Sequence, residues 1–304
     1  MKILAIVVRY QMPLSESRTV RGLCDALSAQ PSLAHGYTVM IWDNSRDAIV
    51  EPKLSIPLLY RHSKENLGVS GAYNAAMEYA LEHGYPWMLL LDQDSEITAD
   101  FLRAMLRYGC DLQERSEIAA IAPNILVRGR LISPQRKLFN RRRLYPTGES
   151  GIAPGEAIVI NSGCLVRTAA LQEIGGFSTD FWLDYSDIYV FHQFFLYGKK
   201  VWRAANVELA HELAVLDYDR LMTPWRYRNI SYAETAFNDL YNGRLENAFQ
   251  TLRLLVRAIK QRMKYDNSVF SQITWDQFLY RLCMSRKTRI TRWLKGGNRF
   301  SISS

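Results

Sequence analysis

The sequence predicts an α/β fold built on a mainly parallel sheet flanked by helices. Short apolar runs rich in β-branched residues alternate with helical patterns through roughly the first hundred residues, which is the order that βαβ units require. The clearest of these runs stop at polar, turn-forming residues. After His211 long helical patterns take over, so we expect a helical C-terminal extension with a boundary near Asp217.

Local patterns predict the elements one by one. The run Lys2–Val8 suits a strand buried on both faces, and Trp87–Leu91 is the clearest strand of the chain. Alanines recur at helical spacing in Gly71–Glu82. The segment Arg128–Ser150 is rich in Arg, Lys, Pro and Gly and is expected to form a mobile basic loop. Further strands are expected at Tyr37–Trp42, Leu58–His62, Ile118–Pro123, Ala157–Ile160 and Val201–Leu209, and further helices at Val20–Leu27, Ala233–Tyr241 and Leu245–Tyr265.

Composition narrows the possible classes of protein. The 304 residues include 48% hydrophobic and 22% charged side chains, which excludes a disordered chain. The formal charge of +8 favours binding to phosphate groups, but it does not distinguish among nucleic acid, a nucleotide and an anionic bilayer as the partner. The four scattered cysteines indicate neither a zinc knuckle nor a disulfide framework and favour a reducing cytoplasm. The N-terminal run is a strand rather than a signal peptide, and no apolar run approaches the ~20 residues that span a bilayer.

Two carboxylates follow the strand at Trp87–Leu91. Asp92 and Asp94 lie one residue apart, where their repulsion is unfavourable unless a cation offsets it. Mg²⁺ or Mn²⁺ carrying a nucleotide diphosphate would supply that charge. Ligands of parallel sheets bind beyond the carboxyl ends of the strands, so Asp43, which ends another strand, should line the same crevice. The alternative is a polar turn before a helix that starts near Thr98.

Several motifs occur in order along the chain. They are Arg9-Tyr10-Gln11, Asp43-Asn44-Ser45, the stretch from Glu65 to Asn74, and Asp92-Gln93-Asp94. Together they resemble the family-2 glycosyltransferases of the GT-A fold, particularly the rhamnosyltransferase-like branch, over about the first 230 residues. The resemblance implies a GT-A-like catalytic domain at residues 1–216, with a nucleotide-sugar half at 1–95 and an acceptor half at 96–216. A basic helical region would follow at 217–304.

The resemblance also implies roles for single residues in donor binding. Asp94 would bind Mg²⁺ or Mn²⁺ directly, with His211 and with Asp92 in support. Gly68 would let the backbone approach the ligand closely, because glycine tolerates a positive φ. Arg228, or its neighbour Arg226, could neutralise the leaving diphosphate. The implied nucleotide-sugar contacts are Tyr10, Asp43, Asn66, Gly68, Asp92, Gln93 and Arg228.

The stretch Phe181–Tyr189 resembles the Phe-Ile-Asp-Tyr-Val-Asp segment of that branch and aligns Asp187 with the catalytic base. Asp184 precedes it by three residues, a spacing that places both carboxylates on one face of a helix. One could accept the proton while the other orients the acceptor. Tyr189 and Gln193 stand where relatives usually carry Glu and Arg. The alternative is that Asp184 caps the helix and Asp187 is a solvated residue of its first turn.

The C-terminal region interleaves cationic and apolar residues at helical spacing, as in Arg253, Val256, Arg257, Ile259 and Lys260. This pattern fits a helix resting on anionic lipid, which would place the protein peripherally on the inner face of the plasma membrane. It also fits a packed helix with a solvated cationic face, or a homodimer formed through the C-terminal helices.

These features predict a metal-dependent, inverting glycosyltransferase that acts in cell-surface polysaccharide synthesis, for example of O-antigen. The donor would be a nucleotide sugar, dTDP-rhamnose by the resemblance, and the acceptor a glycan or lipid-linked glycan. One alternative is a sugar nucleotidyltransferase, although the loop Arg9–Arg18 lacks glycine. Another is a basic nucleic-acid-binding protein, which leaves the ordered acidic positions unexplained. A degenerate fold that binds a partner is the third. The glycosyltransferase prediction requires Asp92, Asp94, Asp187 and His211 to converge.

Overall fold

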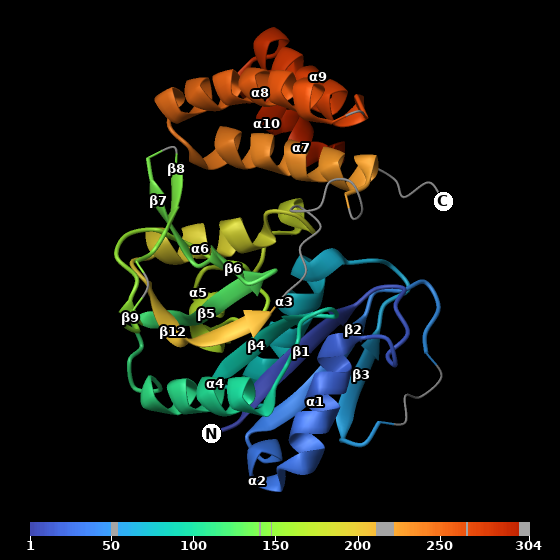
Figure 1. The fold of residues 1–304 in the computed structure, drawn as a ribbon, viewed down its shortest axis with the longest axis vertical. Helices are drawn as coiled ribbons and strands as arrows, with labels where there is room; N and C mark the ends of the chain where they lie inside the picture. The colour runs from blue at the N-terminus through green and yellow to red at the C-terminus, as the bar shows by residue number, and fades with distance from the viewer. Residues whose placement is uncertain (50–53, 140, 147, 211–221, 266, 298–304) are drawn as a thin grey trace. The chain divides into compact units, whose positions relative to one another are not determined.

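A computed structural model describes residues 1–49, 54–139, 141–146, 148–210, 222–265 and 267–297 (Figure 1). The chain divides into two compact units. The first comprises Met1–Lys137 and Arg142–Glu212, and the second comprises Leu138–Arg141 and Leu213–Ser304. The first unit is an α/β unit and the second is helical.

A mainly parallel sheet is the centre of the α/β unit. Its strands are β1 (Ile3–Arg9), β2 (Tyr37–Asp43), β3 (Leu58–His62), β4 (Trp87–Asp92), β5 (Ile118–Val127), β6 (Arg130–Ser133), β9 (Gly151–Ile152), β11 (Leu165–Arg167) and β12 (Lys200–Ala210). Their order is β3-β2-β1-β4-β11-β5-β12-β9, with β6 beside β5 (Figure 1). The strands β3, β2, β1 and β4 run parallel, as do β5 and β12, whereas β11 runs antiparallel between β4 and β5.

Helices cover both faces of this sheet, because its central strands are apolar on both. Ile3, Ala5 and Val7 of β1 belong to one core, and the alternate residues Leu4 and Ile6 to the other. The first core includes buried residues of α1 and α4, and the second those of α3, α5 and α6. These helices are α1 (Arg18–Ala29), α3 (Gly68–Glu82), α4 (Ala99–Asp111), α5 (Thr168–Glu173) and α6 (Ser186–Leu196), with the short helices α2 (Pro31–Ala34) and η1 (Thr179–Phe181) between them. The predicted fold class is confirmed.

The prediction of a basic loop over Arg128–Ser150 is wrong. Besides β6, this segment contains β7 (Gln135–Leu138) and β8 (Arg141–Leu144), which form a small sheet with β10 (Ala157–Ile158) in the order β10-β7-β8. All four residues of β8 are exposed, so the strand has no apolar face for the sequence pattern to reveal. The strand expected at Ala157–Ile160 is shorter than predicted and pairs with β7 rather than with the central sheet.

The helical unit contains α7 (Pro224–Tyr241), α8 (Arg244–Lys264), α9 (Val269–Cys283), α10 (Arg286–Arg292) and one π-helical turn, η3 (Trp293–Gly297). Helix α7 starts well before the predicted Ala233, because Thr223 caps it by accepting from the backbone N–H of Arg226 and Pro224 suits its first position. Helix α8 lies within one residue of its prediction at both ends.

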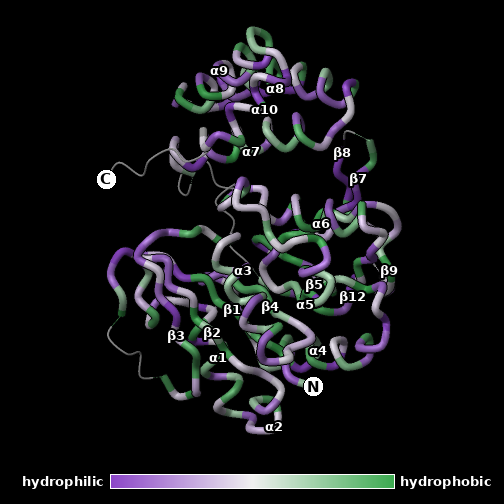
Figure 2. The backbone as a smooth tube through the Cα atoms, turned by 180° about the vertical axis from the view of Figure 1, so that it is seen from behind, coloured by the Kyte–Doolittle hydropathy of each residue, from purple (hydrophilic) through white to green (hydrophobic). Residues whose placement is uncertain are grey.

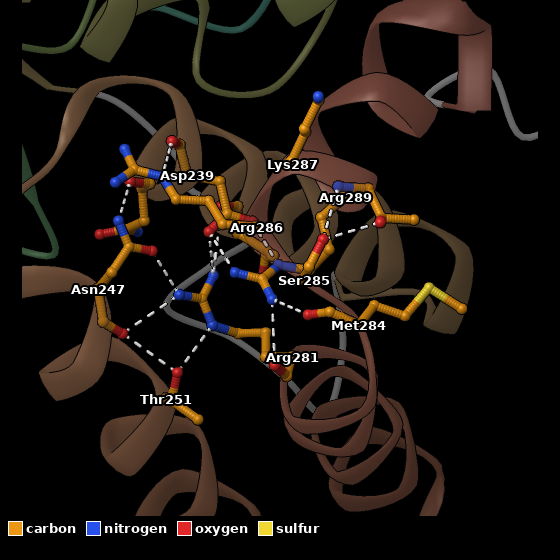
Figure 3. A network of polar contacts seen from close by, with 12 residues as sticks. Asp239, Asn247, Thr251, Arg281, Met284, Ser285, Arg286, Lys287 and Arg289 are labelled. Carbon is orange, nitrogen blue, oxygen red and sulfur yellow. Dashed lines mark hydrogen bonds and ion pairs between the residues drawn. The ribbon is translucent and has the colours of Figure 1, made fainter. Parts of the chain in front are cut away.

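Charged groups are packed inside the helical unit (Figure 3). Asp239 of α7 is 1% exposed and accepts from Arg289 through both carboxylate oxygens, each at 2.7 Å. Arg281 of α9 is also buried, with Nη1 3.2 Å from Asp239 Oδ1 and Nη2 3.2 Å from the carbonyl oxygen of Asn247. A buried charge needs such pairing, so this network binds α7, α8, α9 and α10 together.

Candidate active site

The acidic turn after β4 is held by the start of α1. Ser17 Oγ donates to the carbonyl oxygen of Gln93 at 2.7 Å, and Thr19 Oγ1 donates to that of Asp92 at 2.6 Å. The backbone N–H of Ser95 in turn donates to Thr19 Oγ1 at 2.9 Å. These hydroxyl groups fix the backbone that carries Asp92 and Asp94. The sequence motifs did not include them, although Ser17 occupies the cap position before a helical pattern.

A second turn, at Asn161–Cys164, lies against the acidic turn. Ser162 Oγ is 2.6 Å from Ser95 Oγ, and the N–H of Gly163 donates to the carbonyl oxygen of Leu90 at 2.7 Å. The insertion of β11 beside β4 creates this contact. Asn161 Nδ2 donates to the hydroxyl oxygen of Ser186 at 3.2 Å, and Ser186 is the first residue of α6. This turn, which belongs to the predicted acceptor half, is therefore next to the acidic turn and to the helix that carries Asp187.

The loop after β1 meets the same turn from the other side. The backbone N–H of Tyr10 donates to Gln93 Oε1 at 2.9 Å, so these two predicted donor contacts are neighbours. The N–H of Gln11, whose φ is +55°, donates to Ser45 Oγ at 2.8 Å. The loops after β1, β2 and β4 thus form one continuous edge at the carboxyl ends of the parallel strands, as predicted.

Asp43 is closed to solvent at this edge. Its carboxylate accepts from Arg9, from Tyr60 Oη at 2.6 Å and from the N–H of Ser45 at 2.9 Å. Burial opposes its ionisation, but these hydrogen bonds and the charge of Arg9 outweigh burial and lower the pKa of the carboxyl. Asp43 is fully buried, so contact with a nucleotide, which the resemblance implies, would require the residues around it to move.

Asn66 and Gly68 shape the start of α3. Asn66 Oδ1 accepts from the N–H of Gly68 at 2.9 Å, and Asn44 Nδ2 donates to the carbonyl oxygen of Gly68 at 2.9 Å. Gly68 has φ +66°, and a Cβ there would lie 2.1 Å from the carbonyl oxygen of Trp182. The glycine therefore permits close approach to the protein's own backbone at Trp182, whereas its close approach to a ligand stays a prediction.

Asp184 and Asp187 do not share a helix. Helix α6 begins at Ser186, and Tyr185 before it has a left-handed conformation with φ +67°. Asp184 therefore precedes the helix, so the predicted common face is wrong. The capping role considered for Asp184 is wrong too, because Tyr185 occupies that position. A left-handed non-glycine residue is uncommon, and the sequence gives no sign of it.

Acidic groups nevertheless gather around Asp187. Burial raises the pKa of its carboxyl to about 6, and the negative charges of Asp184 and Asp92 add to the rise. Tyr73 of α3 is fully buried, and burial together with the charges of Asp92 and Asp187 raises the pKa of its phenol. Each of these groups acts on Asp187 or on a common neighbour, so Asp92 and Asp187 do converge, although 95 positions would separate them in an unfolded chain.

Arg142 is a neighbour that the motifs missed. It lies on β8, its charge lowers the pKa of Asp187 against the effect of burial, and its Nη2 is 3.5 Å from the hydroxyl of Tyr185. The sequence signal for it is the basic run Arg141–Arg143, which lies in the segment expected to form a mobile loop. The strand instead holds a cation beside the acidic group.

The metal prediction rests on oxygen donors at the acidic turn. Asp92 and Asp94 are both half-buried there, and carboxylate oxygens suit Mg²⁺ or Mn²⁺. Among the described residues, which exclude 211–221, there is no group of three His, Cys, Asp or Glu placed to hold a metal ion. The predicted ligand His211 lies outside the described residues. Mg²⁺ is commonly bound by one or two carboxylates plus substrate phosphates, and the acidic turn fits that mode.

Arg228 is the remaining predicted donor contact. It lies on α7 of the helical unit, and its side chain is exposed.

Comparison with known proteins gives related sequences and folds. A family model described as glycosyl transferase family 2 matches residues 19–175. Galactofuranosyltransferase GlfT1 of Mycobacterium tuberculosis is 28% identical over 180 residues, and this region covers 57% of the chain and 58% of the relative in both strains compared, CDC 1551 / Oshkosh and ATCC 25618 / H37Rv. The chain thus spans somewhat over half the length of these relatives.

The fold also resembles solved structures. A crystal structure of S. aureus TarS 1-349 aligns with a TM-score of 0.50 and 14% identity, covering 97% of this chain and 92% of that one. TarS 1-349 in complex with UDP-GlcNAc aligns with a TM-score of 0.50 and 16% identity, covering 97% and 80%. At this identity the likeness concerns the fold, which agrees with the predicted GT-A-like architecture.

Proposed function

Because the chain belongs to glycosyl transferase family 2, we propose that it transfers a sugar from a nucleoside diphosphate donor to a hydroxyl group of a glycan during cell-wall polysaccharide synthesis. The observation that supports this most directly is the position of Asp187. Its carboxyl lies close to Asp92 at the carboxyl edge of the sheet, with a pKa raised to about 6. A general base works best with a pKa near the working pH, which an ordinary exposed aspartate lacks.

The proposed reaction inverts the configuration at the anomeric carbon. Asp187 accepts the proton of the acceptor hydroxyl while that oxygen attacks the anomeric carbon. The new carbon–oxygen bond forms as the bond to the diphosphate breaks on the opposite side, and the nucleoside diphosphate leaves with the bonding electrons. Attacking oxygen and leaving group must be held in line, and the contacts from Ser162 to the acidic turn and from Asn161 to α6 hold the two sides of the site together.

Donor binding is proposed to use the continuous edge formed by the loops after β1, β2 and β4. Tyr10, Asn66 and Gln93 would contact the base and ribose, and the buried Asp43 would hold Arg9 and the loop in place. Asp92 and Asp94 would hold Mg²⁺ or Mn²⁺ together with the donor phosphates. When bound, such an ion offsets the negative charge on the departing diphosphate. Arg228 is proposed as a further cation for that diphosphate, as the resemblance implies.

Acceptor binding is proposed to involve Asp184 and Arg142. Both act electrostatically on Asp187, so both are candidates for contact with an acceptor that Asp187 deprotonates. Asp184 would orient the acceptor by accepting a hydrogen bond from a sugar hydroxyl. Arg142 favours the ionised form of Asp187, because its positive charge opposes the effect of burial on the pKa of this carboxyl.

A panel of nucleotide sugars tests this function. Donor binding raises the melting temperature by mass action, so each sugar is tested by thermal shift with Mn²⁺ and with EDTA. The panel includes dTDP-rhamnose, which the resemblance to the rhamnosyltransferase-like branch implies, a galactofuranosyl donor, suggested by the name of the relative, and UDP-GlcNAc. A stabilising donor is then incubated with glycan acceptors, and release of nucleoside diphosphate and the anomeric configuration of the product are measured. Absence of stabilisation by every donor, or retention of configuration, contradicts the proposal.

A further inference from the structure

Helix α8 presents its apolar side to solvent and its polar side to the interior. Asn247, Gln250 and Gln261 are buried together with Leu254 and Ala258. The exposed apolar residues are Leu245 (71% exposed), Phe249 (48%), Leu252 (56%), Val256 (43%), Ile259 (51%) and Met263 (83%). Figure 2 shows hydrophobic and hydrophilic residues alternating along the helix. A helix on the surface of a water-soluble domain normally has the opposite arrangement.

The six exposed residues form one stripe, here called the α8 stripe. Successive members are separated alternately by four and three positions, so they follow a single line along the helix. Helix α9 also exposes apolar residues, namely Trp275, Leu279 and Leu282, although Phe270 and Ile273 nearer its start are buried. Such contiguous exposed apolar surface marks an interaction site rather than ordinary scatter.

Cations accompany the α8 stripe. Helix α8 carries Arg244, Arg253, Arg257, Lys260, Arg262 and Lys264, and its single acidic residue is Glu246. A hollow of about 530 Å³ lies on this helix, where Phe249, Leu252 and Val256 share the lining with Arg253, Lys260 and Lys264. Apolar and cationic groups therefore face the same space.

We propose that the α8 stripe docks the protein on an anionic phospholipid bilayer, with the helix lying in the plane of the interface. Lys260 and Lys264 would contact lipid phosphates while Leu252, Val256 and Ile259 enter the acyl boundary. Helix α8 is amphipathic and cationic, as interfacial helices are. None of the helices in the described part of the chain has the length and apolarity needed to cross a membrane.

Charge decides between a bilayer and a second copy of the chain. Two α8 helices packed along their stripes would bring cations against cations, with only Glu246 on each to offset them. The acid that pairs with Arg257 is Glu234 of α7, within the same chain. An anionic bilayer supplies the complementary charge over the whole length of the stripe.

Vesicle flotation tests this proposal without donor or acceptor, so its result does not depend on the proposed sugar transfer. The full chain is mixed with vesicles of phosphatidylcholine and phosphatidylglycerol, or of phosphatidylcholine alone. We expect binding to the anionic vesicles that weakens as salt is raised. The variant Lys260→Gln/Lys264→Gln should bind at least about tenfold more weakly, since each cation near the surface contributes roughly a fivefold factor. The matched control Lys2→Gln/Arg21→Gln removes two exposed cations of the α/β unit and should bind normally.

The apolar contribution is tested by Leu252→Ser/Ile259→Ser, which should abolish flotation. Its control, Phe195→Ser/Leu196→Ser, removes two apolar side chains of similar exposure, 45% and 58%, from the end of α6 and should float normally. The proposal is overturned if wild type does not float with anionic vesicles, or if Leu252→Ser/Ile259→Ser floats as well as wild type. It is also overturned if sedimentation shows a dimer that this variant converts to a monomer, since the stripe would then be a subunit interface.

Discussion

The backbone N–H of Ser70 donates a hydrogen bond to the carbonyl oxygen of Trp182, 3.1 Å away. Ser70 Oγ also donates to the carbonyl oxygen of Phe181 at 2.7 Å. These bonds join the start of α3, on the proposed donor side, to the segment that leads into α6 and Asp187. The two sides of the site are therefore held together by the protein alone, before any substrate binds.

Replacing Gly68 should disturb this junction. The variant Gly68→Ala adds a Cβ that would lie 2.1 Å from the carbonyl oxygen of Trp182, at a residue with φ +66°. We expect a loss of more than about 2 kcal/mol in the free energy of unfolding, measured with urea. Gly84→Ala is the control, since Gly84 has φ +71° but no atom within 4 Å of its added Cβ. It should lose only about 1 kcal/mol, the cost of the left-handed conformation. Equal losses would show that contact with Trp182 is unimportant.

Replacing Asp187 should separate binding from turnover. Asp187→Asn keeps the size of the side chain but removes its ability to accept a proton, so turnover should fall about a hundredfold to ten-thousandfold. The dissociation constant of the donor, measured by calorimetry, should change little. Asp180→Asn is the control, because burial raises the pKa of the Asp180 carboxyl too, and Asp180 is given no role in the proposed reaction. Near-normal turnover by Asp187→Asn would exclude it as the base.

The pH dependence of kcat/KM should report the pKa of Asp187. A base acts when deprotonated, so activity should be lost as the pH falls through about 6, the value to which burial raises this carboxyl. In Arg142→Gln the nearby positive charge is gone, which disfavours the carboxylate and should move the loss of activity to higher pH. Arg143→Gln removes the next exposed arginine of β8 and should leave the profile in place. A profile that Arg142→Gln does not shift would contradict the assignment of Asp187.

Replacing Asp94 should uncouple nucleotide binding from divalent metal. With Asp94→Ala, calorimetry should show the affinity for nucleoside diphosphate in the presence of Mn²⁺ falling by roughly tenfold or more, towards the value that wild type has with EDTA. Asp100→Ala is the control, because Asp100 is exposed on α4 and pairs with Arg103. If Asp94→Ala binds nucleotide as wild type does and still responds to Mn²⁺, Asp94 is not a metal ligand.

Most of the α/β unit could be predicted from the sequence, because each central strand corresponds to an apolar run and the order of these runs gives the order of the strands along the chain. β1, β2 and β4 are buried on both faces, so each appears as a continuous apolar segment that stops at a polar turn. The edge formed by Asp43 and Asp92 then follows from the parallel arrangement. The small sheet of β7, β8 and β10 escaped prediction because β8 is exposed throughout, and its pairing depends on contacts distant in sequence.

The details around Asp187 could not be predicted for a different reason. The break between Asp184 and α6 depends on the left-handed conformation of Tyr185, which the tertiary structure imposes against the preference of the residue. The raised pKa of Asp187 depends on burial and on charges from β4 and β8. The spacing of residues along the chain reveals neither effect. The order of the motifs therefore predicted Asp187 as the base, whereas its surroundings could be seen only in the folded chain.

The inverted α8 has a consequence for sequence variation among related chains. In most domains the buried apolar residues are conserved among related sequences, whereas the exposed residues vary. In this helical unit we expect the reverse. The buried residues Asp239, Arg281 and Asn247 should be substituted only together, because they pair with one another. At the exposed positions of the α8 stripe, substitutions among apolar residues should be common and substitutions to acidic residues should be rare.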